Sequence, residues 1–271
     1  MDPAFLHKAL ELAPDAHGRL RGVIPTGWKV VVGVHGGVQA ALLTKAAGMA
    51  AGPDRRVRSI TVHFVRPAQP GAITIDTDVV REGSGMTFIS LRLEQDGRPV
   101  ALALAAAGID RESLDHDRLP MPDAKAPEDT AAVPYIEGLM PQFMDKAELR
   151  PVAGGGPGNP SPDGSASVTA WMKAHGDIEL NEPTLAFLAD LAWPTVFALE
   201  GKMLGAPTID LTLHFRSPAP ADNDGWVLGQ FSTQLVRDGH FEEDGVLWSR
   251  DGTPLVHSRQ LALMLPMPEA S

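Results

Sequence analysis

Three residues in the second half of the chain have the side-chain types that can activate a water molecule. They are Asp190, Thr208 and Gln260. A carboxylate can act as a general base, while a hydroxyl and an amide can hold a water by hydrogen bonds and fix its angle of attack. The three residues are far apart along the chain. The fold must therefore bring them together if they act on the same water.

An internal repeat singles these residues out. The segment Thr-Val-His-Phe at 61–64 returns as Thr-Leu-His-Phe at 212–215, an offset of 151 residues, and Asp-Gly-x-Pro at 96–99 returns at 251–254. Motifs that recur in the same order indicate two copies of one structural unit. Aligned on the two histidines, the first copy has Gln39, Val57 and Ala105 where the second has Asp190, Thr208 and Gln260. We expect chemistry where the two copies differ in this way.

The hydrophobic pattern predicts the elements that must position these residues. Residues 38–51 are rich in Ala and Leu, which predicts a helix buried on nearly all sides. A second buried helix is predicted over 182–192, with a break at Trp193-Pro194, and it would carry Asp190. A short polar helix is predicted over 3–12. Strands are predicted over 28–32, 59–66, 72–82, 86–95, 98–107, 165–174, 208–216, 226–237, 240–249 and 254–265.

An antiparallel sheet wrapped around each buried helix satisfies this order of elements. The predicted fold class is therefore α+β, with two tandem units that each wrap an antiparallel sheet around a long apolar helix. The first unit covers residues 1–110 and the second covers 165–271. Pro, Asp and Gly accumulate in residues 111–164, which predicts a linker that crosses the surface.

Composition and missing motifs exclude several classes of function. The net charge of −11 argues against a nucleic-acid partner, and the absence of Cys excludes disulfides and Cys nucleophiles. The longest near-apolar run, 38–51, is too short to span a membrane, and the first residues do not form a signal peptide. We therefore predict a cytoplasmic protein. Neither Gly-x-Ser-x-Gly nor His-Glu-x-x-His occurs, so we expect no metal and no cofactor.

The motifs resemble those of the double-hotdog acyl-CoA thioesterases, the acyl-CoA thioesterase II group. The resemblance rests on Ala189-Asp190, on 207–215 and His257-Ser-Arg-Gln260, and in the first half on 35–42 and 62–67. It implies hydrolysis of acyl-CoA in fatty acid metabolism, with water activated by residues that match Asp190, Thr208 and Gln260. The family's typical Asp-Phe-Asn reads Asp-Leu-Ala at 190–192 here, which bears on substrate choice more than on reaction type.

The start of the first buried helix is the predicted place for the thioester carbonyl. The backbone amides of Gly37 and Val38 lie where a helix has unpaired donors and the positive end of its dipole. We expect them to stabilise the oxyanion, with the catalytic carboxylate supplied by the other copy. His35 and Gly36 are predicted to contact the substrate. A capping or surface role is the alternative for His35.

Structural roles are the alternatives for the catalytic residues. Asp190 can pair with Arg259 or cap the break before Pro194. Threonine is common in strands, which alone would explain Thr208. Gln260 can form a hydrogen bond across the sheet without a catalytic role.

Two other functions stay open beside thioester hydrolysis. One is a non-catalytic acyl-CoA-binding protein. The other is a hotdog-type hydratase or dehydratase, although the sequence lacks an Asp-His pair on one loop beside the predicted helix. The expected partners are an acyl-CoA substrate and further copies of the chain, in a homodimer or larger homo-oligomer. The length or aromatic character of the acyl group does not follow from the sequence.

Overall fold

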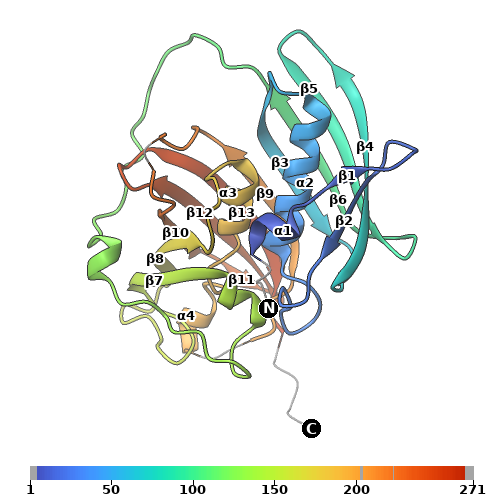
Figure 1. Ribbon diagram of the computed structural model, residues 1–271. Coiled ribbons are helices and arrows are strands. Elements are labelled where there is room, and N and C mark those ends of the chain that lie inside the picture. The colour runs from blue at the N-terminus through green and yellow to red at the C-terminus, as the bar shows by residue number, and fades with distance from the viewer. Residues whose placement is uncertain (1–4, 202–203, 222, 266–271) are drawn as a thin grey trace.

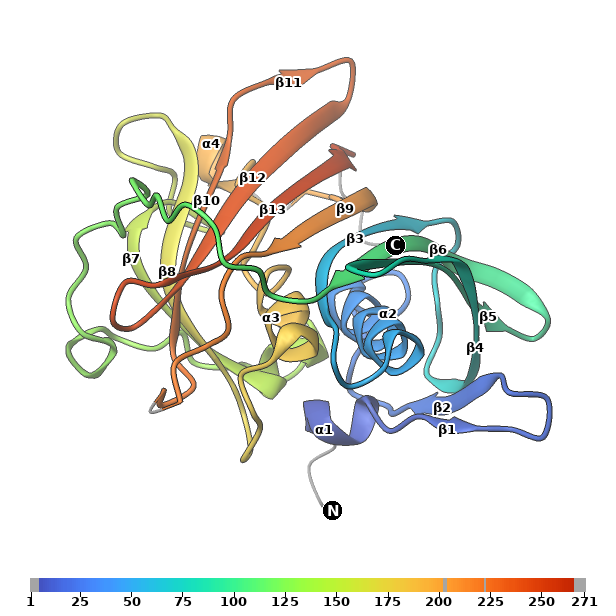
Figure 2. The ribbon, with the colours of Figure 1, turned by 90° about the horizontal axis from the view of Figure 1, so that it is seen from above.

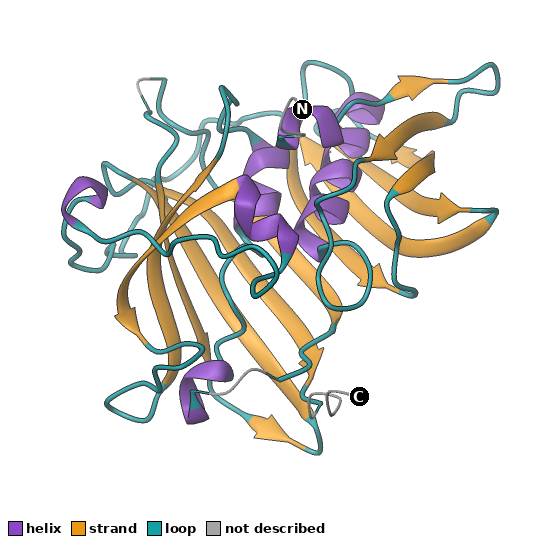
Figure 3. Cartoon of the chain, turned by 60° about the horizontal axis from the view of Figure 1, so that its bottom comes forward, coloured by secondary structure: helices purple, strands orange, loops and turns teal. Residues whose placement is uncertain are grey.

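The computed structural model describes residues 5–201, 204–221 and 223–265. Its strands form one large antiparallel sheet with few helices (Figure 1). Neighbouring strands follow the order β1-β2-β4-β5-β6-β3-β9-β13-β12-β10-β8-β7, and β11 pairs with β12. The helices α2 and α3 gather on one side of this sheet (Figure 3). None of the helices in the described residues is long and apolar enough to cross a membrane.

The first half of the chain wraps its strands around one helix. The elements in chain order are α1 (Leu6–Ala9), β1 (Ala13–Pro14), β2 (Leu20–Ile24), α2 (Gly36–Ala51), β3 (Arg56–Phe64), β4 (Gly71–Glu82), β5 (Met86–Gln95) and β6 (Arg98–Gly108). Every residue from Gly37 to Thr44 in α2 is buried, so the helix is covered on all sides. Figure 2 shows α2 inside the curve of β3 to β6. This burial confirms the helix that its Ala- and Leu-rich sequence predicts.

The second half has a shorter helix on the same side of the sheet. Its elements are η1 (Pro127–Asp129), η2 (Gln142–Lys146), β7 (Ala147–Gly154), β8 (Ala166–Ala174), α3 (Glu182–Leu188), α4 (Phe197–Glu200), β9 (Thr208–Phe215), β10 (Val227–Thr233), β11 (Val236–Arg237), β12 (His240–Ser249) and β13 (Pro254–Leu263). Asn181 caps α3, because its side chain accepts a hydrogen bond from the amide of Thr184 at 3.2 Å. Helices α2 and α3 pack against each other.

The two halves join through the antiparallel pair β3 and β9. Thr61 lies opposite Thr212, and the two hydroxyl oxygens are 3.0 Å apart. On either side, Ser59 lies opposite His214 and His63 lies opposite Asp210. The repeated segments of the two halves therefore pair directly with each other at the centre of the sheet.

The predicted second helix, 182–192, is wrong in its last turn. The helix α3 ends at Leu188, and Asp190 lies in the turn that follows. The amide of Asp190 bonds to the carbonyl of Phe187, and the amide of Leu191 bonds to that of Leu188, both at 3.2 Å. These bonds span three residues instead of four, so the chain tightens and leaves the α-helical path.

Other predicted elements also differ from the structure. Residues 28–32 form a loop instead of a strand, and β2 occupies the place next to β4. Gly33 allows the loop to turn with a φ of 90°, and the loop closes with a bridge between Lys29 and Val34. Residues 147–154, inside the predicted linker, form β7 because they find a partner strand in β8. The helix predicted over 3–12 is reduced to α1, and residues 3 and 4 lie outside the described residues.

Candidate active site

The start of α2 and the turn after α3 meet at the boundary between the two halves. His35 precedes α2, and its Nε2 lies 2.8 Å from the backbone oxygen of Asp190 and 3.4 Å from Asp190 Oδ2. The amide of Gly37 donates a hydrogen bond to the Asp190 carboxylate. The carboxylate of one half therefore satisfies a donor at the helix start of the other half, where the helix itself leaves amides unpaired.

The start of α2 lies so close to the segment of Phe187 and Asp190 that it requires glycine at 36 and 37. A Cβ on Gly36 would lie 2.9 Å from Asp190 Oδ2. A Cβ on Gly37 would lie 2.9 Å from the backbone oxygen of Phe187 and 3.0 Å from Asp190 Cβ. The two separations of 2.9 Å are too short for a real Cβ. A side chain at Gly36 would displace the Asp190 carboxylate, and one at Gly37 would push α2 away from the backbone of α3.

Burial dominates the electrostatics of Asp190 and His35. Burial raises the pKa of Asp190 from 3.8 to about 7, against the opposing effect of the hydrogen bond from Gly37. Burial lowers the pKa of His35 to about 4, so its imidazole is neutral near pH 7. The ring stacks on Phe143 with centroids 3.9 Å apart. His35 is buried, so the surface alternative is wrong. It occupies the N-cap position of α2, as the capping alternative expects, although its side chain makes no capping hydrogen bond.

Thr208 and Gln260 form a second group of contacts on neighbouring strands. Thr208 opens β9, and its hydroxyl donates to Gln260 Oε1 at 2.8 Å. Gln260 Nε2 donates to Glu243 Oε1 at 2.7 Å, and Gln260 lies opposite Glu243 between β13 and β12. The amide of Gln260 is thus held at both ends.

Glu243 connects this group to the segment that carries Asp190. Its Oε2 accepts a hydrogen bond from the amide of Thr195 at 2.8 Å, and Thr195 follows Asp190 by only five residues. Burial raises the pKa of Glu243, the hydrogen bonds from Thr195 and Gln260 oppose that rise, and the negative charge of Asp190 adds to it. The two carboxyl groups are therefore close enough to influence each other's ionisation.

The sequence-predicted residues fall into these two groups. His35, Gly36 and Gly37 meet Asp190, and Thr208 meets Gln260. Val38 is fully buried in the first turn of α2. The alternative partner for Asp190 is wrong, because Arg259 pairs with Asp244 at 2.5 Å. The cross-sheet bond proposed as the alternative for Gln260 is present, in the form of its contact with Glu243.

Sequence reasoning missed Glu243, although its strand had been predicted. In β12 the buried residues alternate as Phe241, Glu243, Gly245 and Leu247. A carboxylate at an inward position of an alternating strand is costly unless it is hydrogen-bonded, and this signal could have identified it.

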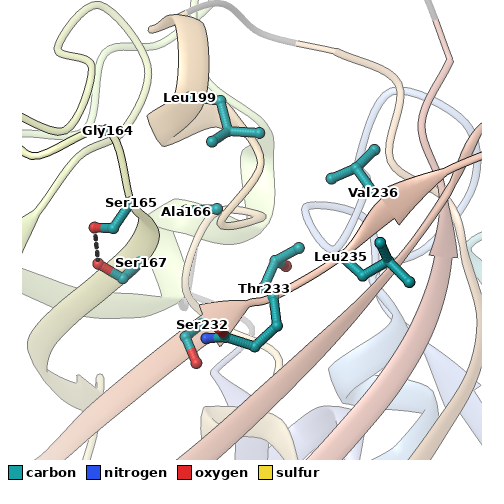
Figure 4. Close-up of a pocket in the computed structure, with 10 residues that line it drawn as sticks. Gly164, Ser165, Ala166, Ser167, Leu199, Ser232, Thr233, Leu235 and Val236 are labelled. Atoms are coloured by element: carbon teal, nitrogen blue, oxygen red, sulfur yellow. Dashed lines mark hydrogen bonds between the residues drawn. The ribbon is translucent and has the colours of Figure 1, made fainter.

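A cavity of about 360 Å³ opens beside the hydrogen-bond network of Glu243, Thr195 and Gln260 (Figure 4). Leu199, Leu235 and Val236 form part of its wall, together with the hydroxyls of Ser165, Ser167 and Thr233. The hydroxyl of Thr233 lies 2.7 Å from that of Thr195, so the cavity wall reaches the Glu243 network. Asp190, Thr208 and Gln260 do not line this cavity.

Solved structures of known fold resemble this chain over nearly its whole length. A hotdog-fold protein of unknown function from Alicyclobacillus acidocaldarius matches with a TM-score of 0.86 and 27% identity, over 96% of this chain and 97% of that one. An acyl-CoA thioesterase II from Mycobacterium marinum matches with a TM-score of 0.75 and 18% identity, over 97% and 99%. The protein therefore belongs to the α+β class and has a hotdog fold.

Sequence comparisons define the family. The acyl-CoA thioesterase N-terminal domain matches residues 24–108, and the acyl-CoA thioesterase C-terminal domain matches residues 122–264. Acyl-coenzyme A thioesterase 8 of Homo sapiens is 22% identical over 83% of this chain and 78% of its own length. The chain belongs to the acyl-CoA thioesterase family and is a thioester hydrolase. This agrees with the resemblance in its motifs.

Proposed function

We propose that the protein hydrolyses acyl-CoA thioesters to a free acid and coenzyme A at the site around Asp190. The observation that carries this proposal is the carboxylate of Asp190, which is nearly buried, has a pKa of about 7 and sits against the start of α2. A base with a pKa near the working pH is ionised in a useful fraction of molecules and is strong enough to take a proton from water.

In the proposed reaction, Asp190 removes a proton from a water molecule while the water oxygen attacks the thioester carbonyl carbon. Thr208 and Gln260 hold that water, and their mutual hydrogen bond fixes the direction of both side chains. The tetrahedral intermediate then breaks its carbon–sulfur bond. The thiolate of coenzyme A leaves and takes up the proton held by Asp190, which restores the carboxylate.

The donors proposed for the carbonyl oxygen are the amides of Gly37 and Val38. Their position in the first turn of α2 supports this role, since helix-start amides lack partners within the helix. The amide of Gly37 also bonds to Asp190. We propose that Gly37 shares its donor between the carboxylate and the oxyanion, and that His35 and Gly36 contact the substrate beside it.

We propose that the domain organisation is a tandem pair of units, residues 1–110 and 165–271, joined by 111–164. The direct pairing of Thr61 with Thr212, its counterpart in the repeat, supports two related units. The strand β7 would then extend the sheet of the second unit from within the connecting segment.

One observation favours a hotdog-type hydratase as the second candidate. The fold brings His35 and Asp190 within 3.4 Å of each other, from two different loops. An Asp-His pair was not apparent from sequence spacing. Such a pair could add water to a 2-enoyl-CoA without breaking the thioester.

The test is a thiol-release assay with acetyl-, hexanoyl-, palmitoyl- and aromatic-CoA esters, run beside an absorbance assay for loss of a 2-enoyl-CoA. We expect thiol release, and we expect D190N to lower kcat by about 10²–10⁴-fold, the range for loss of a general base. An unchanged rate in D190N would refute its role. Loss of the enoyl absorbance without thiol would favour the hydratase, and tight binding without either change would favour the acyl-CoA-binding protein.

A further inference from the structure

We propose that Glu243 is a positioning residue that sets the direction of the Gln260 amide and ties the Asp190 segment to the sheet. This inference rests on the proposed function of Asp190, Thr208 and Gln260. It adds a residue that contacts neither the water nor the substrate and acts through Gln260.

The first argument is the polarity of the Gln260 amide. A glutamine side chain can lie either way round, because its oxygen and nitrogen have nearly the same shape. Both oxygens of Glu243 accept hydrogen bonds, Oε2 from the backbone amide of Thr195 and Oε1 from Gln260 Nε2 at 2.7 Å, so this arrangement favours the orientation in which the Gln260 nitrogen faces Glu243. Gln260 Oε1 is then left to accept from the Thr208 hydroxyl at 2.8 Å. Glu243 thereby determines which atoms of Gln260 and Thr208 are left for the water.

The second argument is the fixed donor on the other side of Glu243. Its Oε2 accepts from the backbone amide of Thr195 at 2.8 Å. A backbone amide cannot be turned round, so the carboxylate position is determined by the main chain. The hydroxyl of Thr195 also lies 2.7 Å from that of Thr233. The segment that follows Asp190 is therefore anchored to β12 and β10 through Glu243 and Thr233.

The third argument is the free-energy cost of burying the Glu243 carboxylate. Glu243 is only 6% exposed, and Phe241, Gly245 and Leu247 are buried on the same face of β12. An apolar side chain of similar size at such a position is often at least as stabilising as a buried charged group. A carboxylate retained there is explained by the positions it imposes on Thr195 and Gln260.

The main test is the variant E243Q, which keeps the shape of the side chain. Because Thr195 requires an oxygen, the new amide must present its NH₂ group to Gln260, and Gln260 must turn over. The NH₂ group of Gln260 would then face Thr208, and the direction of the hydrogen bond between Thr208 and Gln260 would be reversed. We expect kcat to fall by about 10–100-fold with KM changed less than about threefold, since positioning affects the chemical step.

Asp244 provides the matched control. It is the next residue on β12, it faces solvent, and it pairs with Arg259. The variant D244N removes the same charge and is expected to leave kcat within about twofold of wild type. The shorter variant E243D retains the charge but withdraws the carboxylate by one carbon–carbon bond, about 1.5 Å. We expect it to lose kcat as well, while a fully active E243D would overturn the proposal.

A double-mutant cycle separates positioning from general damage to the fold. If Glu243 acts through Gln260, the kcat of E243Q/Q260A should equal that of Q260A within about twofold. Losses that multiply, or an E243Q variant with wild-type kcat, would overturn the inference while leaving the proposed function intact. Failure of the proposed function is distinct, because wild-type protein would then release no thiol from any ester.

Discussion

At the scale of single residues, Asp190 is under two opposing influences. The start of α2 and the amide of Gly37 favour its ionised form, while burial of the side chain, only 13% exposed, favours the protonated form. Burial prevails, and the pKa rises to about 7. The same contacts that fix the carboxylate therefore also make it a stronger base than an exposed Asp.

This pKa predicts the pH dependence of the reaction. The base acts as a carboxylate, so log(kcat/KM) should rise with a slope of about one below pH 7 and level off above it. His35 should not add an inflection in this range, because burial lowers its pKa to about 4. Initial rates of thiol release between pH 5 and 9 measure the profile. A profile that stays flat from pH 5 to 9, as a base with the ordinary Asp pKa of about 3.9 would give, would contradict the environment described for Asp190.

The raised pKa also predicts that D190N is more stable than wild type at high pH. Well below pH 3.8 the carboxyl is protonated in both the folded and the unfolded chain. As pH rises through 4 to 7, the unfolded chain ionises first, so the wild-type protein loses stability, and the loss is complete above about pH 7. A pKa raised from 3.8 to about 7 corresponds to on the order of 4 kcal/mol.

Thermal unfolding of wild type and D190N at pH 8 and pH 4 measures this difference. The amide oxygen of Asn can still accept from Gly37, so the contact with α2 is preserved. We expect a clearly higher Tm for D190N at pH 8 and nearly equal values at pH 4. A variant less stable at pH 8 would show that the carboxylate stabilises the junction instead of straining it.

At the scale of elements, the position of the start of α2 depends on two residues without side chains, Gly36 and Gly37. Gly36 and Gly37 let the helix approach the turn after α3 until its amide reaches Asp190. The same helix contains Gly48, where a Cβ would meet Val57 Cγ2 at 3.9 Å, an ordinary contact. The two glycines, Gly37 and Gly48, therefore have different roles within one element.

The variants G37A and G48A should shift stability in opposite directions. In G37A the new Cβ would lie 2.9 Å from a backbone oxygen of Phe187, which cannot move without α3, so we expect a lower Tm and loss of thiol release. In G48A, replacing helical Gly by Ala should stabilise by about 0.5–1 kcal/mol with activity unchanged. Equal behaviour of the two variants in thermal unfolding would contradict the close packing at Gly37.

Sequence patterns anticipated the elements better than the places where they end. The near-apolar run of α2 and the alternation in β5 and β12 determine those elements locally. The end of α3 at Leu188 depends instead on bonds in the turn at Asp190 and on packing against α2. The strand next to β4 is β2, not the strand predicted at 28–32. This pairing depends on tertiary contacts with β4, which the local sequence pattern does not encode.

The candidate site was predictable to a similar extent. Comparison of the two copies identified Asp190, Thr208 and Gln260 because each differs from its counterpart. The contacts of His35 with Asp190, and of Glu243 with Thr195, join residues from separate segments. Their partners depend on tertiary packing, and a single sequence does not specify them.

At the scale of the whole molecule, the outer face of the sheet exposes apolar side chains. Phe88 on β5 and Leu102 and Leu104 on β6 point to the same face, because Phe88 lies opposite Ala106 and the outward positions alternate. Leu104 is 56% exposed. Such a face suits contact with a second copy of the chain.

We predict a homodimer or larger assembly that the variant L104D weakens. Light scattering at micromolar concentration measures the mass of each form. The control is L114D, because Leu114 is 91% exposed and lies outside the sheet, so its assembly should match wild type. A monomeric wild-type protein would count against this prediction.

The pairing of Thr61 with Thr212 relates the two halves by a local twofold axis through that pair, since Ser59 and His63 exchange partners symmetrically about it. Such symmetry generates every feature of the boundary twice. The counterpart of Asp190 is Gln39, a neutral side chain whose amide is already bonded to the carbonyl of Val34 at 3.1 Å. Of the two related positions, one carries an acid and the other carries a neutral amide. The number of reaction centres in any assembly should thus equal the number of polypeptides, not twice that number.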